Sequence, residues 1–250
     1  MKKIIAWAIA GLISVPAFAQ SNVQIYGVID LGFRHLSGSE MWPPGAKSRS
    51  AIDSSGQSVS RLGFRGTEDL GNGLKAFFTI ESELAPDYSS QTVDDRKAFV
   101  GLEGRFGRAW LGRDYNPSRA FVADLDPFGM TGIGSAQQLF GQQTWYSNGV
   151  FYRTPDFDGL SVSLAYSRHF WGPDESPVVK GDPDLNGKAW SITPVYRRGA
   201  LTVGFGYERY SGDFFDGKRW NLGGRYDFGV VDIRLAYGRD EYEPSKRKVW

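Results

Sequence analysis

Residues 60–84, SRLGFRGTEDLGNGLKAFFTIESEL, contain two segments that alternate polar and apolar residues around a central Gly-Asn-Gly. In the first segment Arg61 and Arg65 alternate with Leu62 and Phe64. A period of two is typical of β-strands, and Gly-Asn-Gly predicts a tight turn between them. One face of this hairpin is therefore apolar and the other carries arginine. The fold depends on whether the apolar face meets a protein interior or lipid.

The same alternation recurs along the chain. Apolar faces are formed by Val23, Ile25, Ile29, Leu31 and Phe33, by Leu160, Val162, Leu164 and Tyr166, and by Val231, Ile233, Leu235 and Tyr237. We count about eleven such strands of the length that a tilted membrane strand needs. Short turns alternate with long polar connections, and no change in composition marks a domain boundary. The sequence therefore predicts a single all-β, antiparallel domain.

The bulk composition excludes several classes of protein. The chain has 250 residues, 29 basic and 28 acidic, so its near-zero net charge suggests no nucleic-acid partner. Because cysteine is absent, there is no disulfide framework and no thiolate metal site. The mean hydropathy of -0.36 resembles that of a soluble protein. A transmembrane barrel has a similar value, because only alternate residues face lipid.

The first 19 residues are predicted to be a cleaved signal peptide. Lys2 and Lys3 precede an apolar run, and Ala17-Phe18-Ala19 forms a small-x-small cleavage pattern. The run is shorter than the roughly 20 residues of a membrane helix. We therefore expect an exported protein whose barrel domain occupies residues 20–250.

Alternation alone suits both a transmembrane barrel and a soluble β-sandwich. Two features favour the barrel: the rhythm of short and long connections, and aromatic residues that recur near strand ends, such as Tyr152, Trp190 and Tyr226. In a barrel, an arginine on the lipid face costs about 2–4 kcal/mol at the membrane midplane. A slip of one residue would expose both Arg61 and Arg65, so the register is well specified.

Several motifs, in order and spacing, resemble the Gram-negative general-diffusion porins of the betaproteobacterial type. They are VQIYGVIDLGF (23–33), the opening hairpin, RKAFVGLEGRFGRAWLGRDYNP (96–117), NGVFYRTPDFDGLSVSLAYS (148–167) and GRYDFGVVDIRLAYGRD (224–240). The resemblance implies an antiparallel barrel of the 16-stranded type. It also implies a homotrimer in outer-membrane lipid that passes small hydrophilic solutes and ions, without enzymatic activity or cofactor.

The last residues, EYEPSKRKVW (241–250), depart from this resemblance because they lack the alternating final strand of the family. We therefore expect a chain truncated at its C-terminus, with only about eleven strands of an incomplete barrel. A fragment without pore function is the first alternative to a working channel.

The longest connection, about 114–145, is too apolar to extend into solvent and should pack against the rest of the chain. The resemblance implies that this loop enters the barrel, with Asp124 and Asp126 opposite Arg61 and Arg96 at a constriction. Further candidates for the pore wall are arginines at strand positions that the alternation places on the inward, polar face, namely Arg34, Arg65, Arg113 and Arg153. Opposed carboxylates and guanidiniums would create a transverse field across the water-filled gap.

Simpler interpretations remain open at these positions. The arginines would also be explained by pairing with Asp30, Glu81, Glu83 or Asp114, and Asp124 and Asp126 by roles in a turn or cap. Arginines favour anions and carboxylates favour cations, so both ion preferences remain open.

Other motifs are weak. DPDLNG (182–187) resembles a calcium loop but has Thr193 where the bidentate glutamate belongs. His35 and His169, the only histidines, lie near Ser37 and Ser167, which gives a minor alternative of a hydrolytic barrel enzyme. We predict no catalytic residues, no metal site and no cofactor.

Overall fold

The computed structural model describes residues 22–37, 48–87, 94–129, 134–136, 145–168, 187–212 and 215–244. Within these ranges the chain forms thirteen strands and one helix. The predicted signal peptide, His169 and most of the DPDLNG segment lie outside the described residues.

The strands fall into a main sheet and a separate ribbon. The main sheet contains β1 (Asn22–Val28), β4 (Arg61–Gly71), β5 (Leu74–Glu83), β6 (Asp94–Gly104), β7 (Gly107–Tyr115), β8 (Trp145–Arg153), β9 (Leu160–Arg168), β10 (Lys188–Arg198), β11 (Leu201–Ser211), β12 (Phe215–Asp227) and β13 (Asp232–Pro244). The ribbon consists of β2 (Leu31–Ser37) and β3 (Ser48–Ser54).

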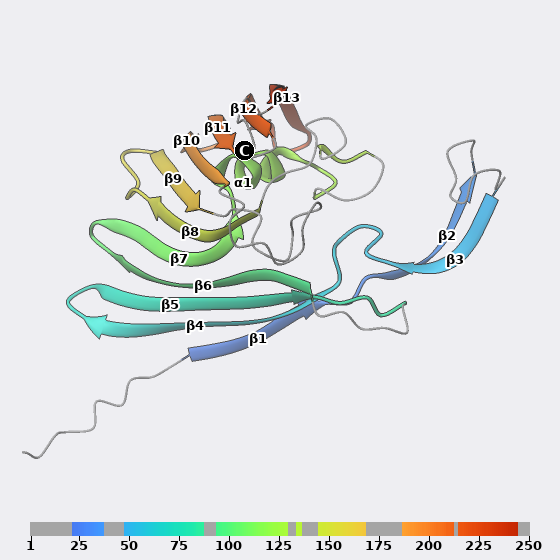
Figure 1. The fold of residues 1–250 in the computed structure, drawn as a ribbon, viewed down its shortest axis with the longest axis horizontal. Coiled ribbons are helices and arrows are strands. Elements are labelled where there is room, and N and C mark those ends of the chain that lie inside the picture. Colours follow the sequence, from blue (N-terminus) through green and yellow to red (C-terminus); the bar gives the residue numbers. More distant parts are fainter. Residues whose placement is uncertain are drawn as a thin grey trace, which may run out of the picture.

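The main sheet has eleven strands, and each is antiparallel to its neighbour in the order β1-β4-β5-β6-β7-β8-β9-β10-β11-β12-β13. The sheet curves strongly, and helix α1 lies within its concavity, while the β2–β3 ribbon extends away from it (Figure 1). Within the described residues β1 and β13 are edge strands that do not pair with each other. The predicted all-β antiparallel fold is confirmed. The main sheet has eleven strands and is open, and the ribbon adds two further strands.

The two faces of the sheet differ in the way that the alternation predicts. On the outer, convex face large apolar side chains are exposed, including Ile25 at 71%, Val100 at 58% and Leu235 at 74%. Arg61, Glu81 and Glu208 face the inner, concave side. The buried core therefore lies on the concave face of the sheet, and the apolar residues of the convex face remain exposed.

The segment predicted as one strand, residues 22–35, is broken at Ile29–Asp30. Val28 pairs with Arg61 in β4, and Leu31 pairs with Ser54 in β3, so two residues face the six residues of 55–60. The Asp30 carboxylate accepts hydrogen bonds from the backbone N–H groups of Gln57 and Ser58. The sequence gives no sign of such an unequal bulge, because the apolar residues continue at every second position on both sides of the break.

The predicted tight turns are confirmed. Gly71, Asn72 and Gly73 have φ angles of 87°, 53° and 77° between β4 and β5. This left-handed region favours glycine and tolerates asparagine.

The long connection after β7, for which the sequence predicted no helix, begins with helix α1 (Pro117–Leu125). The Asn116 side chain accepts a hydrogen bond from the Arg119 N–H, and Pro117 occupies the first helical turn. Both are standard signals of a helix start, which the sequence analysis missed. In the described part of the chain no helix is long and apolar enough to cross a membrane.

Candidate functional site

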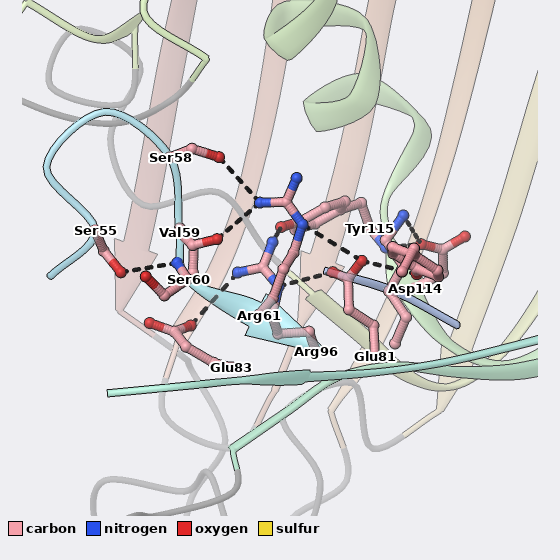
Figure 2. A network of polar contacts seen from close by, with 12 residues as sticks. Ser55, Ser58, Val59, Ser60, Arg61, Glu81, Glu83, Arg96, Asp114 and Tyr115 are labelled. Carbon is pink, nitrogen blue, oxygen red and sulfur yellow. Dashed lines mark hydrogen bonds and ion pairs between the residues drawn. The ribbon is translucent and has the colours of Figure 1, made fainter. Parts of the chain in front are cut away.

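Arg61 and Arg96 meet on the inner face through a shared carboxylate (Figure 2). Arg96 Nε donates to Glu81 Oε1 at 2.8 Å, and its Nη1 lies 3.4 Å from Glu83 Oε2. Arg61 Nε lies 3.7 Å from Glu81 Oε2. Its Nη1 also donates to Ser58 Oγ and to the Val59 carbonyl, at 3.1 Å and 2.8 Å. The structure therefore brings together the two arginines that the resemblance singled out.

A bulge explains how two consecutive cations reach the same face. Glu81 pairs with Lys97, but the next residue, Ser82, pairs with Asp95. Arg96 is therefore an extra residue on β6, and its side chain reaches Glu81 beside that of Lys97. Bulges re-aim side chains in this way. Strict alternation would have placed one of the two in lipid.

Next to this pair, four cations surround two aromatic rings that lie close together at an angle of 30°. The rings of Tyr115 and Trp145 lie 3.7 Å apart between centroids at the ends of β7 and β8. We define the arginine–aromatic cluster as Arg96, Lys97, Arg113, Tyr115, Arg119 and Trp145. Arg119 of α1 lies 3.6 Å from the Tyr115 ring centre, and Arg113 lies 5.1 Å from that of Trp145. Arg96 Nη2 donates to the Tyr115 hydroxyl at 2.7 Å.

The charges of this region do not balance. Its carboxylates are Glu81 and Glu83 beside Arg96, and Asp114, which lies 3.4 Å from Lys97 Nζ. Arg119 makes no ion pair within the described part of the chain, and its Nε is buried without a hydrogen-bond partner. Burial lowers the pKa of Arg119 to about 10, which leaves the guanidinium protonated at neutral pH. Among the described residues, five cations, with Arg61 included, therefore face three carboxylates.

Helix α1 packs on the opposite side of the concavity, against β9 to β13. Glycines on the inner face make room for it. A Cβ atom added to Gly204 would lie 2.6 Å from the Phe121 ring, and one at Gly223 would lie 2.4 Å from Leu125 Cδ1. Any larger residue would hold the helix away from the sheet. Phe121 and Leu125 pack with Val195 of β10 in a buried apolar cluster.

A buried polar network fixes the start of the same helix. Glu208 has no exposed surface and accepts hydrogen bonds from the Tyr146 hydroxyl at 2.9 Å and from Asn116 Nδ2 at 3.4 Å. Arg219 Nη1 lies 3.7 Å from Glu208, and Arg219 also pairs with Asp240 of β13. Breaking a buried charge network of this kind is costly, because the remaining partner is left without compensation.

The two loop carboxylates lie on the α1 side of the concavity. Asp124 pairs with Arg197 of β10. Asp126 is buried and accepts hydrogen bonds from the backbone N–H groups of Phe128 and Ala136, which is the turn role that the sequence left open. The ion pairs of Arg61 and Arg96 within the described residues run to Glu81 and Glu83, not to these aspartates.

The remaining predicted arginines are dispersed. Arg34 lies on the β2–β3 ribbon, 3.7 Å from Asp53. Arg65 donates to Gln24, and Arg153 lies near Ser161. Only Arg113 joins the arginine–aromatic cluster, where it donates to Ser147.

Sequence reasoning missed Arg119, Lys97 and the Glu208 network. With Arg96 on the inner face, strict alternation along β6 would turn Lys97 to the outer face, so Lys97 was not predicted. Arg119 belongs to a helix that was not predicted. The aromatic pair at strand ends that meet across β7 and β8 was the available signal for a cation-binding surface. The loop at 114–145 was expected to pack because it is apolar. Of its apolar residues Phe121 and Leu125 are buried, whereas Phe128 is 56% exposed, and Met130, Ile133, Leu139 and Phe140 lie outside the described residues.

The chain matches the family model described as Gram-negative porin over residues 6–248. It is 32% identical over 250 residues to outer membrane porin protein 32 of Delftia acidovorans, an alignment that covers 93% of this chain and 67% of that protein. An outer membrane porin of Bordetella pertussis is 31% identical, with coverage of 95% and 69%.

Solved structures of similar fold include an anion-selective porin from Comamonas acidovorans. It has a TM-score of 0.75 and 28% identity, and the match covers 90% of this chain and 69% of that one. The outer membrane protein OmpT of Vibrio cholerae in its trimer form has a TM-score of 0.67 at 15% identity, over 91% and 68% of the two chains, and shows a shared fold alone.

Proposed function

The chain belongs to the Gram-negative porin family, and on that premise we propose that it forms a passive channel with a preference for anions. Porins are outer-membrane channels and not enzymes, as the sequence predicted. The proposed solutes are small hydrophilic molecules and ions, which would pass along the inner face. The exposed apolar residues of the outer face would contact the hydrocarbon of the membrane.

The anion preference is carried by one observation, the excess of cations over carboxylates among the described residues around Tyr115 and Trp145. A charge of one sign, held at a wall of low dielectric, raises the local concentration of ions of the opposite sign. The similarity to a protein described as an anion-selective porin supports the same sign. Guanidinium groups keep this charge across physiological pH.

We further propose that the loop at 114–145 narrows the channel. Support comes from α1, which occupies the concavity and is held there by apolar, polar and charged contacts. Asp124 is 57% exposed at its side chain and pairs with Arg197 of β10, whereas Arg61 and Arg96 lie on β4 and β6, so the two groups would set a transverse field across the remaining gap. The role of Asp126 would be to hold the turn after α1. A homotrimer is also proposed, as the assembly that the resemblance to this family implies.

The test is ion selectivity in planar bilayers. The protein would be refolded in detergent, inserted singly, and its reversal potential measured under a KCl gradient. We expect stepwise openings of constant size and a reversal potential between zero and the equilibrium potential of chloride. A reversal potential between zero and the equilibrium potential of potassium would reject the anion preference. An absence of steps from well-folded protein would reject the channel itself. Chemical cross-linking in detergent would test the trimer separately.

A further inference from the structure

The inner face carries a line of aromatic rings that a water-filled passage does not require. Four rings, which we define as the aromatic row, follow each other across β5 to β8: Phe77, Phe99, Trp110 and Phe151. Trp110 and Phe151 stack with centroids 5.3 Å apart and planes within 5° of each other. Phe99 lies 6.3 Å from Trp110 and 6.2 Å from Phe77.

Helix α1 does not account for this row. The helix packs against β9 to β13, and its apolar cluster of Phe121, Leu125 and Val195 is separate from the cluster that contains Phe151. Phe77 and Phe151 are buried beneath their neighbours, but Phe99 and Trp110 remain partly exposed on the concave side. These two rings therefore present aromatic surface to the passage.

Cations lie near aromatic rings at both ends of strand β7. Arg108 lies 3.8 Å from the Phe77 ring centre and 5.8 Å from that of Trp110, and its side chain is 42% exposed. At the far end of β7 stands the arginine–aromatic cluster, with Arg119 over Tyr115. Trp110 and Tyr115 are five residues apart on one strand, about 17 Å. Arg113 lies between them and faces Trp145.

We propose that the wall formed by β5 to β8 is a binding track for planar aromatic carboxylates, whose ring stacks on Trp110 or Phe99 while the carboxylate binds Arg108 or Arg113. This deepens the proposed function, on which it rests, by naming a class of solute. An aliphatic anion would gain only the charge interaction. An aromatic anion would also gain stacking on the rings and contact with the guanidinium planes.

The probes are benzoate and cyclohexanecarboxylate, which share charge and approximate size but differ in planarity and π-electrons. Equilibrium dialysis against the refolded protein in detergent measures binding whether or not the protein conducts. We expect benzoate to bind about threefold to tenfold more tightly than cyclohexanecarboxylate. In bilayers benzoate should also reduce the chloride current in a saturable way, and cyclohexanecarboxylate should do so less.

Matched substitutions locate the site. Trp110→Leu should remove most of the difference between the two probes, whereas Trp190→Leu, on the exposed outer face, should leave it unchanged. Because Trp110 also donates to Asp114, Phe99→Leu serves as a second variant, with the outer-face Phe205→Leu as its control.

The outcomes separate this inference from the channel assignment. Equal binding of the two probes to wild-type protein would overturn the track and leave an anion channel intact. Preferential benzoate binding without any conductance would keep the track and reject the channel. A preference for benzoate that survives both Trp110→Leu and Phe99→Leu would also overturn the inference.

Discussion

The inner faces of β4–β7 and of β10–β13 obey the same alternation, yet they treat charge in opposite ways. On β10–β13, Glu208 and Arg219 are almost fully buried beside the start of α1, within one hydrogen-bonded network. On β4–β7 the cations outnumber the carboxylates and remain partly exposed, as Arg61 is at 27% of its side chain. Buried charge must be paired, whereas charge beside water is available to act on solutes.

The wall of β10–β13 can therefore be regarded as a dock for the loop, and the wall of β4–β7 as the surface that acts on solutes. If this division is correct, changes to the dock should affect stability first, and changes to the cation-rich wall should affect selectivity with little effect on stability. The following experiments test that contrast in order of decreasing effect.

The largest effect is expected from Glu208→Ala. The change leaves Arg219, Tyr146 and Asn116 without their shared acceptor, and loss of one partner of a buried ion pair costs about 3–5 kcal/mol. Urea unfolding of the refolded protein, followed by tryptophan fluorescence, would measure it. Glu208→Gln keeps an acceptor and should lose less. An unchanged unfolding midpoint for Glu208→Ala would show that the network does not hold the dock.

Gly204→Val should follow. Its side chain would occupy the place of the Phe121 ring, and overpacking of this kind costs about 1–3 kcal/mol. We expect α1 to lift from the sheet, which would give faster proteolysis of the loop and larger, noisier conductance steps. Gly32→Val on the ribbon, where an added Cβ meets nothing within 4 Å, is the matched control. Equal protease resistance in both variants would argue that the glycines do not position the helix.

Arg119→Gln should change selectivity and leave stability nearly unaffected. Removing one unit charge about 15 Å from a passing ion, at an effective dielectric constant of about 20, disfavours chloride by about 1 kcal/mol and favours potassium by the same amount, so the chloride-to-potassium permeability ratio should fall by about thirtyfold. Reversal potentials would measure the ratio. Arg198→Gln, an exposed residue paired with Asp158, should leave it unchanged. A similar fall in both variants would indicate a general effect of net charge.

The smallest effect is expected from Asp124→Asn. Its carboxylate is more than half exposed and already pairs with Arg197, so its field on the passage is partly cancelled. The anion preference should rise by about twofold or less. A fall in anion preference would have the wrong sign and would remove Asp124 from the proposed transverse field.

The alternation predicted the strands, their faces and the inward position of Arg61 and Arg65 because one face of each strand must be apolar throughout. The turn at Gly71–Gly73 was equally predictable, since its backbone conformation requires these residue types. The break at Asp30 and the bulge at Arg96 could not be predicted. Each adds residues to one strand only, and the sequence of one strand does not show how many residues the neighbouring strand places opposite it.

The place where the loop docks had a sequence signal that the alternation analysis did not use. Gly204, Gly206 and Gly223 occupy inward positions on adjacent strands, where a barrel wall would otherwise carry side chains. Three glycines on one face of neighbouring strands indicate that something approaches the backbone closely. The charge excess near Arg119, in contrast, depends on contacts between β6, β7, β8 and α1 that only the folded chain defines.

The inward-facing glycines beneath α1, Gly204, Gly206 and Gly223, also have an evolutionary implication. Strand positions that contribute no side chains impose no shape of their own on the passage, so its bore is governed by whichever helix rests on them. New permeability could thus arise by exchanging residues within a single insert, while the scaffold that must be assembled into the membrane stays the same.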